Sequence, residues 1–296
     1  MSTPPSESRR ELSSTYMVPD RSNQEEITRL LVQDRLFTST MGGLLAEQPE
    51  PILFERVLDV GCGPGIWPIE MAQTYPDISL LVGIDISEKM LDSARQEALA
   101  RQVNERVEFL VMDALGHLAF PDKYFSLVNQ RLGISWMRKW DRSRLLQEYQ
   151  RVLCPQGVLR ITELNGALES ASPALGQLWD LGAQAFYQSG ISFTRSGDGL
   201  DEEIARLLTH QGLEQVQIRA YTLEYRAGTV EGQLFVDDML SLFHTIKPFL
   251  QKWVRLPANY EDVYQQMMHE IQEPDFIATA RLSTIWGRKA SETPDI

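Results

Sequence analysis

The sequence is poor in cysteine and histidine, the residues that build disulfide frameworks and most transition-metal sites. Cys62 and Cys154 are the two cysteines among 296 residues, and each falls inside an apparent strand or helix motif. Four histidines occur without metal-ligand spacing, at His117, His210, His244 and His269. We therefore expect reduced thiols, no metal centre and a cytoplasmic location.

Long apolar runs and an excess of basic charge are also missing. No stretch approaches the roughly 18 apolar residues of a transmembrane helix, and residues 1–11 lack the apolar core of a secretory signal. The 28 Lys and Arg residues face 41 Asp and Glu residues, which gives a net charge of −13. Because such a surface repels phosphate backbones and anionic lipids, we expect neither nucleic acid nor membrane as a partner.

What the sequence does contain is an alternation of short buried strands and helices. Strands are predicted over residues 56–60, 79–84, 107–112, 125–128 and 157–162, and helices over 66–74, 87–101 and 141–153. Strands and helices in this order form a parallel sheet covered on both faces. The fold class is therefore α/β and doubly wound, and ligands of such sheets bind at the carboxyl ends of the strands.

The last third of the chain predicts two further strands separated by a long helical segment. A helix over 201–211 is followed by a strand over 213–220, and a final strand covers 278–288. Between them, apolar residues from Phe235 to Trp253 recur at three- and four-residue steps, and Pro248 should split that helix. A second helix then reaches Ile271, with Asn259 as its predicted N-cap.

A glycine-rich loop follows the first strand and opens a helix. It reads Asp59-Val60-Gly61-Cys62-Gly63-Pro64-Gly65. Ile66 stands where a dinucleotide-binding loop prefers glycine, and the Gly-Lys-Ser/Thr ending of a phosphate loop is missing. An acid two positions before Gly61 suits a ligand with an ammonium group better than a pyrophosphate. Asp59 either contacts that ligand or orients the loop amides.

Two further acids follow the next two strands. A carboxylate at Asp85 is placed to accept hydrogen bonds from a ribose diol, and one at Asp113 from an adenine amine. Together with the loop, these acids describe a nucleoside joined to an amino acid without phosphates, as in S-adenosylmethionine. A nicotinamide-dependent oxidoreductase is the weaker alternative because of the loop spacing.

At this point the sequence resembles the class I S-adenosylmethionine-dependent methyltransferases over residues 57–163. The matching segments are the loop at 57–65, residues 83–87 with Met90, residues 109–114, residues 120–125, and residues 151–157, where Gln156 replaces a glycine. The resemblance implies a Rossmann-like, seven-stranded sheet, mostly parallel with the last strand antiparallel, and S-adenosylmethionine as cofactor. The cofactor contacts that we expect are Asp59, Gly61, Cys62, Gly63, Asp85, Ile86, Met90, Asp113 and Ala114, with Asn129 and Arg131 as candidates after the fourth strand.

A looser resemblance spans nearly the whole chain. Tyr16-Met17-Val18-Pro19, Glu26, Arg29-Leu30 with Gln33, and residues 285–289 are similar to methyltransferase-like proteins of secondary metabolism, including fungal regulators and their bacterial relatives. Substrates in such groups vary, so this resemblance fixes no acceptor.

Two insertions are long enough to cover the cofactor site. We place helical cap insertions at about 164–199 and 223–278, within a methyltransferase domain at 51–296. Residues 1–50 are assigned to an N-terminal tail, polar over 1–14, a capping helix over 23–45 and a linker at 47–51. Connections of this length are usually functional.

The aromatic character of the cap favours a small, largely hydrophobic acceptor. The predicted substrate-binding residues are Tyr16, Trp136, Trp179, Phe235, Met239 and His244. An aromatic stripe is more often simply core, and a core or surface role is also the commoner one for His244. Glu163, after the fifth strand, is either a general base or an orienting residue, and no clear catalytic base stands out.

The sequence thus predicts a methyltransferase that acts on a small hydrophobic molecule in secondary metabolism. The alternative is a regulatory, non-methylating protein that binds the cofactor. The absence of an Asn/Asp-Pro-Pro-aromatic tetrapeptide at residues 129–132, together with the charge, disfavours nucleic-acid methylation. Hydroxyl, amine and carbon acceptors all stay open, as do oligomeric state and pathway.

Overall fold

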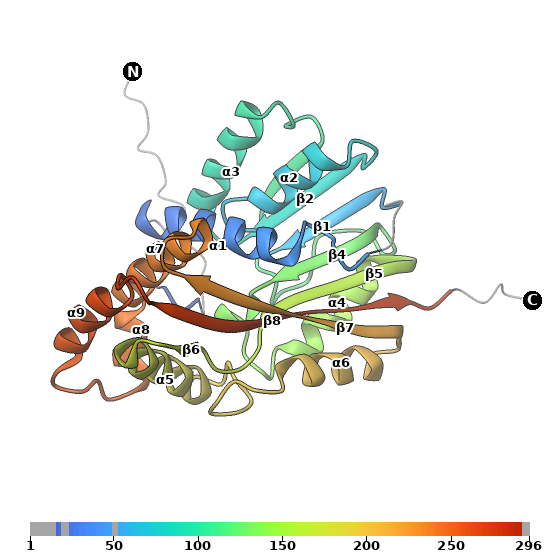
Figure 1. Ribbon diagram of the computed structural model, residues 1–296. Coiled ribbons are helices and arrows are strands. Elements are labelled where there is room, and N and C mark those ends of the chain that lie inside the picture. The colour runs from blue at the N-terminus through green and yellow to red at the C-terminus, as the bar shows by residue number, and fades with distance from the viewer. Residues whose placement is uncertain (1–15, 19–23, 49–52, 292–296) are drawn as a thin grey trace, which may run out of the picture.

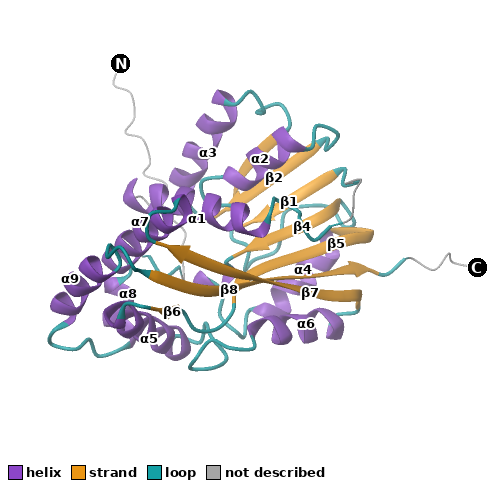
Figure 2. Cartoon of the chain, viewed as in Figure 1, coloured by secondary structure: helices purple, strands orange, loops and turns teal. Residues whose placement is uncertain are grey.

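A twisted, mixed β-sheet runs through the middle of the molecule, with helices on both faces (Figures 1 and 2). The computed structural model describes residues 16–18, 24–48 and 53–291. The predicted tail over 1–14 and part of the predicted linker at 47–51 lie outside the described residues. The strands are β1 (Arg56–Val60), β2 (Leu80–Asp85), β3 (Val107–Val111), β4 (Phe125–Arg131), β5 (Leu153–Leu164), β6 (Glu169–Ser170), β7 (Leu213–Arg226) and β8 (Ile277–Lys289).

The first five strands are parallel and bring the predicted loop and acids to one edge of the sheet. Their spatial order is β3-β2-β1-β4-β5, and β8 runs antiparallel between β5 and β7. This confirms the α/β fold class, the mostly parallel sheet and the antiparallel last strand. An eighth strand, the two-residue β6, was not predicted; it pairs with Ala278 and Thr279 of β8 beyond the end of β5.

The helices are α1 (Gln24–Met41), α2 (Ile66–Thr74), α3 (Glu88–Ala100), α4 (Arg142–Val152), α5 (Pro173–Gln188), α6 (Leu200–His210), α7 (Val230–Thr245), α8 (Lys247–Trp253) and α9 (Tyr260–Glu270), with a 3₁₀ turn η1 at Gly133–Ser135. Helices α2 and α3 cover one face of the sheet, α4 and α6 cover the other, and α5, α7, α8 and α9 form a separate group. Neighbouring residues of β1 point to opposite faces. Val57 therefore packs in the core under α2 and α3, and Leu58 in the core under α4 and α6.

Local sequence rules explain several helix ends. Ser87 caps α3, because its side chain accepts a hydrogen bond from the backbone N–H of Met90. Pro248 separates α7 from α8, as predicted, because proline is tolerated in the first turn of a helix but not in its interior. Asn259 occupies the N-cap position of α9, as predicted, but it does not cap the helix with its side chain. Its side chain makes no capping hydrogen bond, because its φ of −96° and ψ of 23° depart from the extended conformation of an N-cap.

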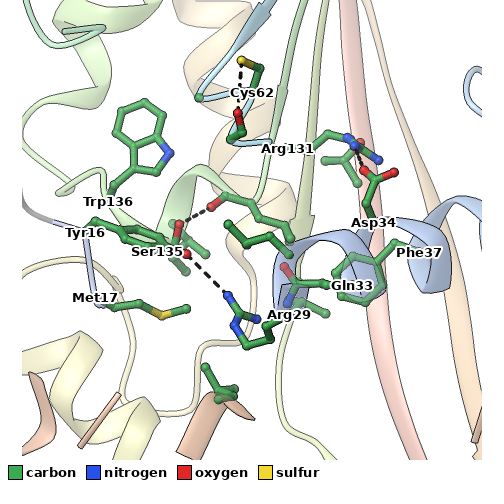
Figure 3. Close-up of a pocket in the computed structure, with 18 of the residues that line it drawn as sticks. Tyr16, Met17, Arg29, Gln33, Asp34, Phe37, Cys62, Arg131, Ser135 and Trp136 are labelled. Atoms are coloured by element: carbon green, nitrogen blue, oxygen red, sulfur yellow. Dashed lines mark hydrogen bonds and ion pairs between the residues drawn. The ribbon is translucent and has the colours of Figure 1, made fainter. Parts of the chain in front are cut away.

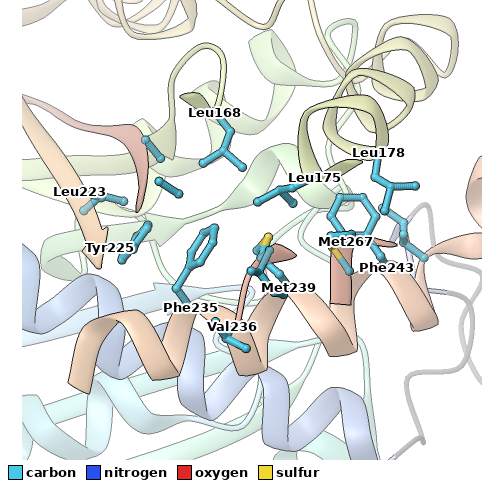
Figure 4. Packing of buried hydrophobic residues seen from close by; sticks show 14 of the residues in the cluster. Leu168, Leu175, Leu178, Leu223, Tyr225, Phe235, Val236, Met239, Phe243 and Met267 are labelled. Carbon is cyan, nitrogen blue, oxygen red and sulfur yellow. The ribbon is translucent and has the colours of Figure 1, made fainter. Parts of the chain in front are cut away.

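A third hydrophobic core holds α5, α7, α8 and α9 against the ends of β7 and β8 (Figure 4). In it, the Phe235 ring stacks on Tyr225 with centroids 4.3 Å apart and lies beside Phe276. Met239 is buried in the same core. The aromatic stripe predicted for this segment is therefore mainly a packing surface that fixes the helices beside the carboxyl edge of the sheet.

Candidate active site

A cavity of about 300 Å³ opens at the carboxyl edge of the parallel strands (Figure 3). One side is lined by the glycine loop and the residues after β2 and β3. The other side is lined by α1, α5 and the last turns of α7. The cavity therefore joins the predicted cofactor edge to the helices that interrupt the sheet.

The glycine loop has a left-handed backbone conformation that residues with a side chain rarely adopt. Gly61, Gly63 and Gly65 all have positive φ values, of 68°, 53° and 74°. A Cβ on Gly65 would lie 2.6 Å from Ala94 and Phe109, so no side chain fits there. The backbone N–H groups of Gly61 and Cys62 donate to the carbonyl of Ile84, which ties the loop to β2.

Asp85 and Asp113 lie on the cavity wall, Asp85 as the last residue of β2 and Asp113 just after β3. Asp85 accepts hydrogen bonds from the backbone N–H of Gly63 at 2.9 Å and of Ser87 at 2.8 Å. Asp113 accepts one from the backbone N–H of Leu115 at 2.9 Å. These bonds fix the carboxylates, and a carboxylate oxygen has a second lone pair for a ligand. The cavity wall also includes Cys62, Ile86, Met90 and Ala114.

Asp59 is a deeply buried acid at the end of β1. Burial raises the pKa of Asp59 to about 7, although Arg131 and a hydrogen bond from Asn129 lower it in part. Asn129 donates to Asp59 at 2.7 Å and accepts from Arg160 at 2.7 Å, and Arg160 pairs with Glu47. Asn129 is fully buried behind Asp59 and does not line the cavity, so it positions this acid.

Arg131 meets an acid that the sequence analysis missed. Its guanidinium pairs with Asp34 of α1 and donates to the hydroxyl of Thr38 at 3.3 Å (Figure 3). The second carboxylate oxygen, Asp34 Oδ2, is buried and accepts no hydrogen bond from any residue in the described ranges. Helical spacing puts the α1 residues of the cavity wall on one face of the helix, but the sequence does not show which neighbour that face meets. These residues are Arg29, Leu30, Gln33, Asp34, Phe37 and Met41.

A buried polar network joins α1 to α7 beside the cavity. Arg29 donates to Glu26 at 2.8 Å and to Asp238 at 2.9 Å, and the hydroxyl of Tyr16 donates to Glu26 at 2.7 Å. All the charged groups are almost inaccessible to solvent. Burial raises the pKa of Tyr16 and of Asp238. Tyr16, Arg29 and Gln33 line the cavity.

Three of the predicted substrate-binding residues line the cavity, and three do not. Tyr16, Trp136 and Trp179 are on its wall. Phe235 and Met239 point into the hydrophobic core instead. The α7 residues on the wall are Leu242 and Phe243, followed by Ile246 just after the helix. They lie one to two turns after Met239, where the helix reaches the cavity.

Neither predicted catalytic residue reaches the cavity. His244 is exposed and its Nδ1 lies 3.3 Å from Glu25, because one helical step of about 100° turns it away from Phe243. Glu163 is buried and accepts hydrogen bonds from Gln130 at 3.3 Å and from the backbone N–H of Ile134 at 3.2 Å. Burial raises the pKa of Glu163 to about 7. These bonds anchor η1 to β4 and β5.

All four histidines and both cysteines of the chain lie within residues 16–18, 24–48 and 53–291. In these ranges, no group of three or more His, Cys, Asp or Glu residues is placed to hold a metal ion. No helix there combines the length and apolar character needed to cross a bilayer.

Known proteins share part of this sequence and, separately, the fold. The model of a family described as a methyltransferase domain matches residues 57–157. The chain is 36% identical over 117 residues to the aklanonic acid methyltransferase DauC of Streptomyces sp. (strain C5), covering 37% of this chain and 52% of the relative. It is 27% identical over 188 residues to the demethylmenaquinone methyltransferase of Porphyromonas gingivalis, covering 59% and 74%.

A solved structure extends the likeness to the fold. Phosphoethanolamine N-methyltransferase 2 of Haemonchus contortus, with phosphomonomethylethanolamine and S-adenosylhomocysteine, superposes with a TM-score of 0.56 at 17% identity. The match covers 95% of this chain and 61% of that one. The chain thus spans about half the length of DauC and shares only the fold with the nematode enzyme. The segment matched by the family runs from β1 into β5 and carries the glycine loop, Asp85 and Asp113.

Proposed function

We propose that this chain, whose residues 57–157 match the model of a methyltransferase domain, transfers the methyl group of S-adenosylmethionine to a small, largely apolar acceptor. The observation that carries this proposal is the cavity at the carboxyl edge of the sheet. It joins the glycine loop and its acids to a wall of apolar side chains from α5 and α7. A cofactor and an acceptor in one enclosed space are what direct methyl transfer requires.

Different polar residues of the cavity wall are assigned to the adenine, the ribose and the amino-acid end of the cofactor. Asp113 and Ala114 would receive the adenine, and Asp85 with Ile86 the ribose. At the other end, Asp59 and Asp34 are two carboxylates near one cation, Arg131. This set matches an amino-acid group, because its ammonium would face Asp34 and Asp59 and its carboxylate would face Arg131.

The chemistry assigned to the protein is mainly positioning. The sulfonium carbon of S-adenosylmethionine is electrophilic by itself, so the chain must hold the nucleophile about 3 Å from it and in line with the departing sulfur. The acids on the described cavity wall are Asp34, Asp59, Asp85 and Asp113, and we assign all four to the cofactor. The acceptor atom would then carry its own lone pair, as a neutral amine, an ionised hydroxyl or an electron-rich carbon.

The apolar side chains of the cavity wall and the names of two relatives both support a small-molecule acceptor. The names of two relatives refer to aklanonic acid and to demethylmenaquinone, which are small molecules. We extend this to a small apolar acceptor here, with secondary metabolism and the cytoplasm as the setting. With a net charge of −13, the chain is not expected to use nucleic acid as a substrate.

Calorimetry with S-adenosylhomocysteine tests the cofactor site. Asp85→Ala should weaken binding about tenfold or more, because the ribose hydroxyls lose a charged acceptor. Asp92→Ala is the control, since Asp92 is an exposed acid on α3 that pairs with Arg95. Equal affinity in wild type and Asp85→Ala would refute the ribose assignment.

Turnover is tested by acceptor-dependent release of S-adenosylhomocysteine, with phenols, amines and hydroxyquinones as acceptors. Release that depends on the acceptor supports an enzyme. Tight cofactor binding without release with any acceptor would favour a regulatory, non-methylating protein.

A further inference from the structure

Helix α5 presents a glycine to the cavity where no backbone contact requires one. Gly182 is buried in the middle of the helix and lies on the cavity wall. An added Cβ at this position would meet no atom within 4 Å. Gly232 of α7 is the opposite case, since a Cβ there would lie 1.9 Å from the carbonyl oxygen of Arg226.

The empty space at Gly182 is therefore part of the cavity. A glycine in the interior of a helix destabilises that helix relative to alanine. Close packing does not account for this cost at Gly182, because nothing lies near the position of the missing side chain. What the glycine does provide is free volume against the helix backbone, inside the cavity.

Aromatic side chains bound this space along the helix. Trp179 lies three positions before Gly182 and Phe186 four positions after it, so all three share one helix face. At 1.5 Å per residue, the two aromatic residues are about 10 Å apart along the axis. The ring of Phe186 packs against the ring of Phe249, with centroids 5.6 Å apart. Phe243 of α7 lines the same cavity.

We propose that Gly182 sets the size of the acceptor, and that the acceptor is a flat fused aromatic ring system lying against α5 at this glycine. The inference rests on the proposed function and specifies its acceptor. Because Gly182 has no side chain, the helix face between the two aromatic side chains is open to the cavity. Fused rings fit against such an open face and gain from edge-to-face or offset contacts with Trp179 and Phe186.

The experiment fills the space and measures which probes still bind. Wild type, Gly182→Ala and Gly182→Leu are saturated with S-adenosylhomocysteine and titrated by calorimetry with phenol, 1-naphthol, 1-hydroxyanthraquinone and 1-decanol. We expect Gly182→Leu to lower the binding affinity for 1-naphthol and 1-hydroxyanthraquinone by about tenfold or more. These fused rings would no longer fit in the volume that the leucine side chain leaves. Gly182→Ala should weaken 1-hydroxyanthraquinone most and phenol least. Binding of 1-decanol should change little, since a chain can bend around the new side chain.

Gly176→Ala is the matched control. Gly176 is also in α5 with open space around an added Cβ, but it does not line the cavity. Both alanine variants should keep or raise the melting temperature, and only the Gly182 variants should change probe binding.

Three results would overturn the inference. The first is equal probe affinities in wild type and Gly182→Leu. The second is that no fused-ring probe binds the wild type. The third is that Gly182→Leu lowers the affinity for 1-decanol as much as the affinity for 1-naphthol. Failure of S-adenosylhomocysteine to bind the wild type would instead refute the proposed function.

Discussion

The acids at the carboxyl edge of the sheet differ in solvent exposure, and this difference determines the pH range in which each one ionises. Asp85 and Asp113 are fixed by backbone N–H groups at the cavity wall. Asp59 is buried against Asn129, and its carboxyl shares the nearby cation Arg131 with Asp34. Asp59 is therefore the acid of this set whose charge changes near neutral pH.

Cofactor affinity should depend on pH through Asp59. The pKa of Asp59 is raised to about 7, and an ammonium group of the ligand stabilises the ionised form. The affinity for S-adenosylhomocysteine should therefore rise from pH 6 to about pH 7 and level off above it, by several-fold in total. Calorimetry at pH 6, 7 and 8 measures this.

Asp59→Asn is the control, because it keeps the acceptor for Asn129 but cannot ionise. It should bind more weakly at pH 8 and show a flat profile. A wild-type profile that is equally flat would contradict the contact between Asp59 and the ammonium group.

At the scale of residues, the position of a side chain in the fold was predictable where the signal was local. Asp85 and Asp113 follow predicted strands, and parallel strands bring their ends together. Asp34 was missed because its role depends on where α1 packs, which no local pattern specifies. Phe235 and Met239 were assigned to the site for the same reason, since periodicity identifies an apolar helix face but not which neighbour it meets.

The elements around the cavity are joined by charge as well as by apolar packing. Arg29 of α1 contacts Glu26 in its own helix and Asp238 of α7, and all three are buried. One cation thus serves two acids. Because burial penalises an unpaired charge, this cation determines how firmly α1 is held to α7.

Replacement of Arg29 should be more costly than replacement of either partner. Arg29→Leu leaves Glu26 and Asp238 buried without a cation, so unfolding in urea should show a loss of about 3 kcal/mol. Asp238→Asn should cost only about 1 kcal/mol, because Arg29 keeps Glu26 and the amide oxygen still accepts a hydrogen bond. Equal losses in the two variants would show that the arrangement is not a shared-cation network.

Element boundaries show which rules are local. Pro248 ends a helix by its own geometry, so the break between α7 and α8 was predictable. The length of β7 was not, because the sequence marks only residues 213–220. The strand continues to Arg226 because β8 offers a partner along the whole length. Strand length thus depended on a segment far away in sequence.

At the scale of the whole molecule, the cofactor cavity collects residues from α1, the parallel strands, α5 and α7. A ligand that contacts several of these elements stabilises the folded state by mass action. At 100 times its Kd, S-adenosylhomocysteine should contribute about 2.7 kcal/mol. For a chain of this size we expect the melting temperature to rise by about 5 °C.

Adenosine tests which elements the ligand joins. It retains the contacts expected at Asp85 and Asp113 but lacks the amino-acid end that would reach Asp34 and Arg131. At the same concentration, its thermal shift should be clearly smaller than that of S-adenosylhomocysteine. Equal shifts would mean that α1 takes no part in binding.

The position of β8 also orders the events of synthesis. This strand follows β5, β6 and β7 in the chain and yet pairs with all three. On the ribosome, the glycine loop and β1 to β4 emerge long before β8, so the cofactor edge can assemble early. The acceptor side is different, because α7 packs on β7 and α8 and α9 pack on α5, and all of these elements are translated after β4. Each new chain therefore acquires the means to hold a nucleoside before it acquires the walls that would choose an acceptor.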